Sequence, residues 1–262
     1  MRATELELLE AAARESGEIA RKYWRDDPQV WDKGQNDPVS EADLAVDQHL
    51  KTRLLGARPD YGWASEETED SLDRLEADRV FICDPIDGTR AFVAGEATWA
   101  HSLAIAERGE VVAAAVYLPV RDKMYLAQKG AGATLNGSEI KASGRGELEG
   151  ATALGPKVNF RPEHWQDDNP PAMKRSFRPS LAYRLSLIAE GRYDAMLTLR
   201  PCWEWDIAAG SLISAEAGAG VSDRNGQALI FNTRNRKTNG VVAAGHQVHG
   251  QIISRLRQSE AS

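Results

Sequence analysis

The chain has 262 residues, of which 42% are hydrophobic, and it carries a formal net charge of −7 at pH 7. This apolar content is enough to bury a core, which excludes global disorder, and the length fits one large domain or two closely packed halves. The acidic balance argues against a dedicated nucleic-acid-binding protein. It does not exclude an anionic substrate, because bound cations can supply positive charge locally.

Two sequence features predict a cytoplasmic protein without a membrane segment. The chain has no run of about 18 apolar residues, and its first residues form an acidic, amphipathic segment rather than the apolar region of a signal peptide. The two cysteines, Cys83 and Cys202, are too few for a disulfide framework.

The first half of the chain predicts two helices and an antiparallel sheet. Thr4 and Glu7 form a capping-box pattern before a helix that reaches Trp24, and a second helix begins near Ser40 and ends before Pro59. A buried strand is expected at 80–83, and further strands joined by glycine-containing turns are expected at 100–107, 111–118, 123–127 and 133–142.

The second half alternates between strand and helix patterns. Helices are expected at 181–190, 207–217 and around 252–256, with extended segments at 193–199 and 241–244. The segment 156–179 contains five prolines and predicts a long loop. We therefore expect an α+β half over residues 1–145 and an α/β half over residues 146–262.

A six-residue motif directly follows the apolar strand, and it reads Asp84-Pro85-Ile86-Asp87-Gly88-Thr89. Magnesium prefers carboxylate and other oxygen ligands, and Asp84 and Asp87 can converge on one ion with the Ile86 carbonyl between them. Asp-Pro and Asp-Gly are each ordinary turn dipeptides, but their combination behind a buried strand favours a site.

The end of the same motif has the features of a phosphate cradle. Gly88 allows a close approach of the backbone to a ligand. If a helix begins near Thr89, its first N–H groups are free to bind an anion. Other acids must join the site from elsewhere, and the candidates are Glu66, Asp206 and Asp43. Taken alone, each of these acids fits a solvated acid or a helix cap.

Together these motifs resemble the inositol monophosphatase family of the lithium-sensitive, magnesium-dependent sugar-phosphatase superfamily. The resemblance rests on 84–89, on Trp205-Asp206-Ile207-Ala208-Ala209-Gly210, and on Ser65-Glu66-Glu67, where Ser65 replaces the glycine of many members. It implies a layered αβαβα sandwich of the inositol monophosphatase/fructose-1,6-bisphosphatase type. It also implies a phosphoric monoester hydrolase, a small phosphate ester as the partner, and a possible homodimer.

The resemblance implies a role for each motif residue and two or three Mg²⁺ ions. Glu66, Asp84 and the Ile86 carbonyl would hold the first ion; Asp84, Asp87 and Asp206 would hold the second; a third would lie near Glu66. The Thr89 hydroxyl, paired with Asp43, would orient the attacking water, while the Gly88 and Thr89 amides hold the phosphate. Lys33 resembles a basic residue that some members place near the metals.

The substrate remains open between several phosphate esters. Inositol enzymes carry an acid seven positions before the final aspartate, and that position here is Leu199. Arg184 and Glu204 are closer to the 3′(2′),5′-bisphosphate nucleotidases, and a second phosphate would suit Arg184. Inositol monophosphate or a similar polyol phosphate is the leading expectation, followed by adenosine bisphosphate and histidinol phosphate. An inactive metal-binding regulatory protein on the same fold is the alternative of another class.

Four other groups of residues have ordinary structural interpretations. Cys83 should be a core thiol facing away from the ligands, because side chains alternate along a strand. Trp203 and Trp205 could line the site or pack in the core. The five histidines are scattered, and each is expected at the surface or at a helix cap. The basic residues of the long loop could bind phosphate or form a solvated surface, and they are Lys157, Arg161, Lys174, Arg175 and Arg178.

Overall fold

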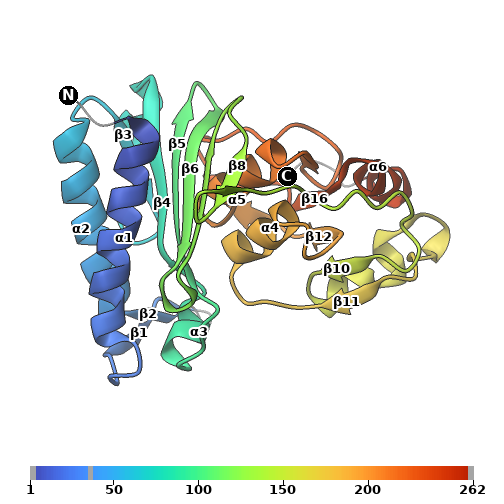
Figure 1. Ribbon diagram of the computed structural model, residues 1–262, viewed down its shortest axis with the longest axis horizontal. Coiled ribbons are helices and arrows are strands. Elements are labelled where there is room, and N and C mark those ends of the chain that lie inside the picture. The colour runs from blue at the N-terminus through green and yellow to red at the C-terminus, as the bar shows by residue number, and fades with distance from the viewer. Residues whose placement is uncertain (1–3, 35–37, 259–262) are drawn as a thin grey trace.

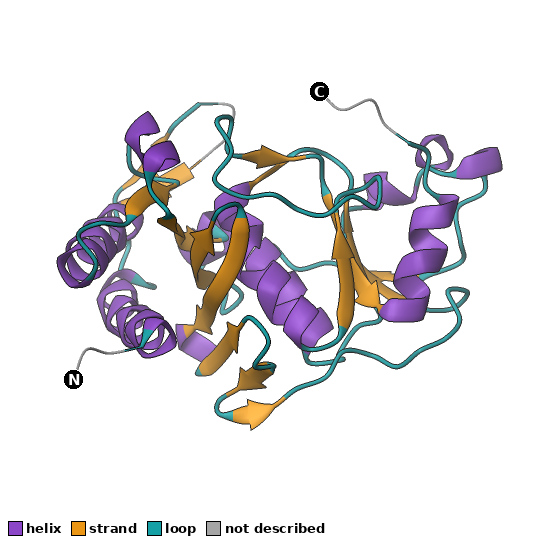
Figure 2. Ribbon diagram, turned by 90° about the horizontal axis from the view of Figure 1, so that it is seen from above, coloured by secondary structure: helices purple, strands orange, loops and turns teal. Residues whose placement is uncertain are grey.

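The computed structural model describes residues 4–34 and 38–258, and these residues form five layers. Two helices cover a large sheet, two further helices separate it from a second sheet, and a last helix covers the far side (Figures 1 and 2). The predicted αβαβα sandwich is therefore confirmed.

The first layer consists of α1 (Glu5–Tyr23) and α2 (Glu41–Ala57). The predicted capping box of α1 is confirmed, since the Glu7 N–H donates to the Thr4 hydroxyl and the Thr4 N–H donates to the Glu7 carboxylate. Leu8, Leu9 and Leu50 lie on the inner faces of the two helices and are buried against the sheet.

The large sheet has seven strands, in the order β3 (Gly62–Ser65), β4 (Arg79–Asp87), β5 (Ala100–Glu107), β6 (Glu110–Leu118), β7 (Lys123–Gln128), β8 (Ala133–Leu135) and β9 (Ser138–Glu139). Only the β3–β4 pair is parallel. The prediction of a single strand at 133–142 is wrong. The structure has two strands there, β8 and β9, because Asn136 and Gly137 both have positive φ and turn the chain between them.

The middle layer consists of α4 (Leu181–Ala189) and α5 (Glu204–Glu216). Both helices are buried on nearly all sides because a sheet lies on each side of them. The second sheet has the order β11 (Lys174–Ser176), β10 (Thr152–Leu154), β12 (Ala195–Thr198), β16 (Val241–Gly245) and β14 (Ala219–Ser222). Its outer face is covered by α6 (His246–Arg255).

Outside the segment 156–179, the remaining elements are short, and they are β1 (Val30–Asp32), β2 (Pro38–Ser40), α3 (Thr89–Val93), β13 (Cys202–Trp203), β15 (Lys237–Thr238) and the 3₁₀ turns Leu72–Glu76 and Pro119–Arg121. None of the helices among the described residues is long and apolar enough to cross a membrane.

The segment 156–179 is not the structureless loop that its prolines predicted. It contains strand β11 and three 3₁₀ turns, at Lys157–Phe160, Pro162–His164 and Gln166–Asp168. Trp165 anchors the segment, because its side chain is fully buried and its indole N–H donates to the Asn159 carbonyl at 3.0 Å. A large buried side chain thus holds a segment that has little regular hydrogen bonding.

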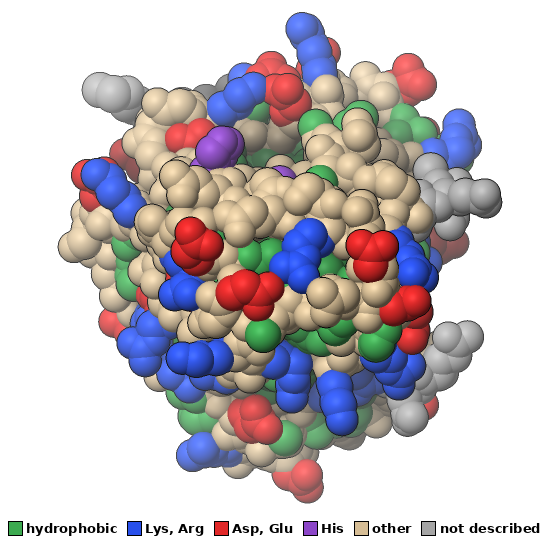
Figure 3. All heavy atoms as spheres, turned by 90° about the vertical axis from the view of Figure 1, so that its right-hand side faces the viewer, with side chains coloured by type: hydrophobic (Ala, Val, Ile, Leu, Met, Phe, Trp, Pro, Cys, Tyr) green, Lys and Arg blue, Asp and Glu red, His purple; other side chains and the backbone are tan. Residues whose placement is uncertain are grey.

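The basic residues of this segment lie mostly on the surface. Lys157, Arg161, Lys174 and Arg175 are exposed, whereas Arg178 is half-buried. Figure 3 looks onto the side formed by the second sheet and α6, where Lys and Arg side chains gather on the lower half with acidic side chains among them. This arrangement favours the interpretation of a solvated surface.

One hydrophobic cluster extends from the large sheet through the middle helices to the second sheet. It includes Ile82, Leu185, Ile213 and Val241, which come from β4, α4, α5 and β16. The two predicted halves therefore share a continuous core, and the proposed boundary near residue 145 stays a prediction.

Candidate metal centre

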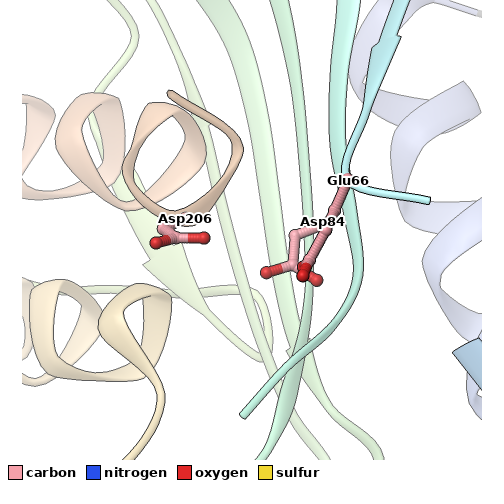
Figure 4. A group of neighbouring side chains, drawn as sticks. All are labelled: Glu66, Asp84 and Asp206. Carbon is pink, nitrogen blue, oxygen red and sulfur yellow. The ribbon is translucent and has the colours of Figure 1, made fainter. Parts of the chain in front are cut away.

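Strand β3 ends at the site beside the parallel strand β4. Ser65 at the end of β3 pairs with Cys83 of β4, and the Glu66 N–H donates to the Cys83 carbonyl at 3.3 Å. This pairing places Glu66 beside Asp84, the next residue of β4. The helix α5 begins at Glu204, three residues earlier than predicted, so Asp206 lies in its first turn and faces the other two acids across the gap (Figure 4).

These three acids form a compact cluster of carboxylates, with one oxygen from each of Glu66, Asp84 and Asp206 lying within 4.8 Å of the others. Asp84 is only 1% exposed, and its Oδ1 is buried without a hydrogen-bond donor among the described residues. Burial and the neighbouring carboxylates, Glu66 first among them, raise the pKa of Asp84 well above its usual value.

Such a cluster is unfavourable unless a cation compensates it, since buried charges need a partner. Three carboxylates, one of which has an oxygen without a hydrogen-bond donor, form the kind of ligand set that Mg²⁺ takes. The donor set of this chain therefore fits a hard divalent cation.

Asp87 lies close to this cluster but is held differently. Its Oδ2 accepts hydrogen bonds from the Ser180 hydroxyl at 2.7 Å and from the Ala182 N–H at 2.6 Å. Burial raises the pKa of Asp87 to about 6, although these hydrogen bonds act in the opposite direction. The sequence did not reveal that Asp87 caps the start of α4, and its role as a metal ligand stays a prediction.

Asp43 and Thr89 lie in direct contact, as the resemblance implied. The Thr89 hydroxyl donates to Asp43 Oδ1 at 3.0 Å and lies 3.1 Å from the Ile86 carbonyl oxygen. Asp43 Oδ2 accepts from the N–H and the hydroxyl of Ser40, which fixes the carboxylate at the start of α2. Burial raises the pKa of Asp43 to about 6.

The predicted turn at Gly88 is present. Gly88 has φ of 99°, a left-handed conformation that favours glycine, and α3 begins at the next residue, Thr89. The phosphate-binding role of the Gly88 and Thr89 amides stays a prediction.

Lys33 reaches the site from the segment after β1. Its ammonium group lies 2.8 Å from a Glu66 oxygen and 2.9 Å from a Glu67 oxygen. Burial opposes the charged ammonium, but the two carboxylates outweigh it and raise the pKa of Lys33. Burial and the charge of Glu66 raise the pKa of Glu67 to about 7. Lys33 therefore compensates part of the negative charge around Glu66.

Asp47 is a site residue that the sequence reasoning missed. It accepts the Ser65 hydroxyl at 2.5 Å and the Thr68 hydroxyl at 2.6 Å, which ties the segment carrying Glu66 to α2. Ser65 thus has a specific partner. The signal was present in the sequence, because Asp43 and Asp47 are four residues apart on a predicted helix and share one face.

His101 was expected at the surface or at a helix cap, and this is wrong. It is fully buried in β5, and its Nδ1 lies at hydrogen-bonding distance from the Pro85 carbonyl oxygen. Burial lowers the pKa of His101 to about 4. The prediction for Cys83 is confirmed, since this free thiol is buried in the cluster below α1 and α2.

The family model for the inositol monophosphatase family matches residues 2–261. The chain belongs to this family. An inositol-1-monophosphatase of Mesorhizobium japonicum is 32% identical, covering 92% of this chain and 91% of the relative. A protein of Pseudomonas aeruginosa named Nus factor SuhB is 38% identical, covering 82% of this chain and 83% of the relative. The solved structure of the extragenic suppressor protein SuhB of Bartonella henselae has a TM-score of 0.80 and 26% identity, covering 94% and 96% of the two chains.

Arg184 lies near the start of α4 and is only 5% exposed. Its guanidinium group donates to the Arg178 and Pro179 carbonyls and lies 4.4 Å above the Phe177 ring. It therefore holds the segment that precedes α4, and its contact with a substrate stays a prediction. Leu199 is only 3% exposed and packs in the core of the second sheet.

The two tryptophans around Glu204 pack against one another. The Trp203 and Trp205 rings stack with centroids 4.7 Å apart, and Trp205 is buried in the large cluster. The Glu204 carboxylate accepts from the Asn232 and Thr233 N–H groups at 2.6 and 2.9 Å. These contacts support the start of α5, and with it the position of Asp206.

Proposed function

We propose that this chain is a magnesium-dependent phosphatase that hydrolyses a small phosphate monoester by attack of a water molecule. The observation that carries the proposal is the cluster of Glu66, Asp84 and Asp206, in which Asp84 Oδ1 is buried and lacks a donor among the described residues. Membership of the inositol monophosphatase family supports the reaction class.

Glu66, Asp84 and Asp206 would hold Mg²⁺, together with the Ile86 carbonyl and Asp87. When bound, Mg²⁺ neutralises phosphate charge and lowers the pKa of a coordinated water. The Ile86 carbonyl oxygen lies 3.1 Å from the Thr89 hydroxyl of the same loop. No covalent intermediate on the protein is needed.

Asp43 and Thr89 would orient the attacking water. Because the Thr89 hydroxyl donates its proton to Asp43, the lone pairs of its oxygen can accept a hydrogen bond from water. Asp43 accepts two further hydrogen bonds from Ser40, which hold its carboxylate in place. The amides of Gly88 and Thr89 would contact the phosphate oxygens.

A polyol phosphate such as inositol monophosphate is our first candidate substrate, supported by the relatives named inositol-1-monophosphatase. The buried Leu199 offers no hydrogen bond to a polyol hydroxyl. Arg184 lies within electrostatic range of the site acids Asp87 and Asp206 and of a second positive charge, Arg200. A substrate with a second phosphate, such as adenosine 3′,5′-bisphosphate, is therefore our second candidate.

The test is phosphate release from inositol 1-phosphate, adenosine 3′,5′-bisphosphate and histidinol phosphate, with Mg²⁺ and with EDTA. We expect release only with Mg²⁺, and we expect Asp84→Asn to lower kcat by several orders of magnitude. Glu139→Gln, which changes an exposed acid of β9, is the matched control and should retain activity. Release that is equal with Mg²⁺ and with EDTA would contradict the proposal.

A regulatory function is the second candidate, because several relatives carry the name Nus factor SuhB. On that alternative the chain would keep the fold and bind cations without turnover. Absence of phosphate release from all three esters, by a folded protein that binds Mg²⁺, would favour it over catalysis.

A further inference from the structure

The metal-binding loop begins with an irregularity in the sheet. Asp84 pairs with Ser102 and Asp87 pairs with Ala100, so Pro85 and Ile86 of β4 both face a single residue of β5. That single residue is His101. A bulge of this kind interrupts the ladder of backbone hydrogen bonds and bends the strand. The Pro85 carbonyl therefore needs a partner other than the regular ladder.

The His101 side chain supplies this partner. A carbonyl oxygen only accepts hydrogen bonds, so the contact with Pro85 requires the proton on His101 Nδ1. The ring is held in place by two aromatic neighbours. The Trp99 ring meets it edge-on with the ring centroids 5.5 Å apart, and the Tyr117 centroid lies 6.5 Å away. His101 Nε2 is buried without a hydrogen-bond partner in the described part of the chain, so the contact with Pro85 is the one that orients the ring.

The hydrogen bond acts on the peptide that separates the expected metal-binding groups. The Pro85 carbonyl belongs to the peptide plane between the Asp84 side chain and the Ile86 carbonyl. The proline ring already fixes φ of Pro85, and holding its carbonyl restricts ψ of Pro85 and φ of Ile86. With these angles restricted, the loop has little freedom to turn either group away from the cluster.

We propose that His101 is a positioning residue that fixes the bulge at Pro85–Ile86 and thereby presents Asp84 and the Ile86 carbonyl to the cation. The inference rests on the proposed function in one respect, which is that the cation is Mg²⁺. His101 is fully buried behind the loop, and its contact there is with the Pro85 carbonyl.

Two substitutions separate the hydrogen bond from the packing. His101→Leu fills the buried space but has no donor, whereas His101→Asn retains an N–H at nearly the position of Nδ1. His249→Leu is the matched control, because His249 is a half-buried histidine whose Nε2 lies 2.9 Å from the Ser222 hydroxyl in the second sheet. Each protein is measured for Mg²⁺ affinity by calorimetry and, in EDTA, for amide hydrogen exchange of residue 84 and residues 86–88.

We expect His101→Leu to weaken Mg²⁺ binding by about 10–100-fold, the range for residues that orient metal ligands, and to accelerate exchange in the loop. His101→Asn should recover most of both properties, and His249→Leu should change neither. Wild-type affinity and exchange in His101→Leu would overturn the inference, and so would an Asn variant that behaves like Leu. Because exchange is measured without metal or substrate, it decides the role of His101 even if the chain lacks phosphatase activity.

Discussion

At the scale of single residues, the Ser65 hydroxyl ties the segment that carries Glu66 to α2. Ser65 is buried and donates to Asp47 at 2.5 Å, so its loss removes a hydrogen bond to a charged group. We expect Ser65→Ala to lower the free energy of unfolding by about 1.5–3 kcal/mol. Urea denaturation measures this change.

The matched control for this change is Ser138→Ala, at an exposed position of the edge strand β9, which should stay within about 0.5 kcal/mol of the wild type. If Ser65→Ala is as stable as Ser138→Ala, the Ser65–Asp47 hydrogen bond does not stabilise the fold.

The Thr89 hydroxyl gives a second prediction at this scale. Thr89→Val keeps the shape of the side chain but cannot accept a hydrogen bond from water or donate to Asp43. We expect kcat to fall by about 10²–10⁴-fold, the usual contribution of a positioned proton-transfer group. Thr89→Ser keeps the hydroxyl and should retain most of the activity. Steady-state kinetics on the ester that the wild type hydrolyses fastest measures this change. Equal kcat values for the Val and Ser variants would exclude a role of the Thr89 hydroxyl in orienting water.

At the scale of elements, Asp87 connects the large sheet to the middle helix layer. Its carboxylate caps α4 through Ser180 and Ala182. Asp87→Asn retains an accepting oxygen, so we expect stability within about 1 kcal/mol of the wild type, whereas Asp87→Ala removes the cap and should cost about 0.5–2 kcal/mol. Both variants should lose several orders of magnitude in turnover if Asp87 also binds the cation.

Thermal unfolding and kinetics on the two variants separate these roles. A loss of turnover in Asp87→Ala alone would mean that the residue acts through the cap, and that the charge is not required.

The sequence predicted the elements whose signals are local. The capping box at Thr4 and Glu7 marked the start of α1, and the apolar stretch 80–83 marked β4. Strand β3 was missed, because Gly62–Ser65 is four residues long and its stability comes from parallel pairing with β4. Short strands that depend on a partner distant in sequence leave little trace in the local pattern.

In the candidate site, too, the sequence predicted the residues with a local motif and missed those that act through contacts between distant segments. The motifs predicted which acids meet, and Glu66, Asp84 and Asp206 do lie together. The motifs did not predict the residues behind the acids, Asp47 and His101. Their importance arises from a hydrogen bond to Ser65 in one case and to the Pro85 carbonyl in the other, and both contacts exist only once the strands are paired.

At the scale of the whole molecule, the site lies where two sheets and the helices between them meet. Glu66 and Asp84 belong to the large sheet, whereas Asp206 belongs to a helix packed between the sheets. The continuous core across these layers keeps the acids at a fixed separation. Charge repulsion within the cluster is thus opposed by the packing of the entire chain. The pH dependence of the free energy of unfolding therefore reports on the ionisation of these acids.

Without metal, the acids of the site should make stability fall as the pH rises. Burial raises the folded-state pKa to about 6 for Asp43 and Asp87, and to about 7 for Glu67. Between about pH 4 and pH 7 the folded state then binds more protons than the unfolded state, so these groups lower the free energy of unfolding as the pH rises. The lowered pKa of His101 acts in the opposite direction over part of this range.

The difference between Mg²⁺ and EDTA isolates the acids, because the histidine contribution is present in both. Mg²⁺ competes with protons for the carboxylates, so its stabilisation should be small at pH 5 and should rise to about 2.7 kcal/mol at pH 8 when Mg²⁺ is in about hundredfold excess over its Kd. Thermal unfolding at both pH values, with and without Mg²⁺, measures this change. Asp84→Asn should abolish most of the Mg²⁺ effect at pH 8. If Mg²⁺ stabilised the wild type equally at pH 5 and pH 8, the cation would bind without displacing protons. The cluster around Asp84 would then not be its site.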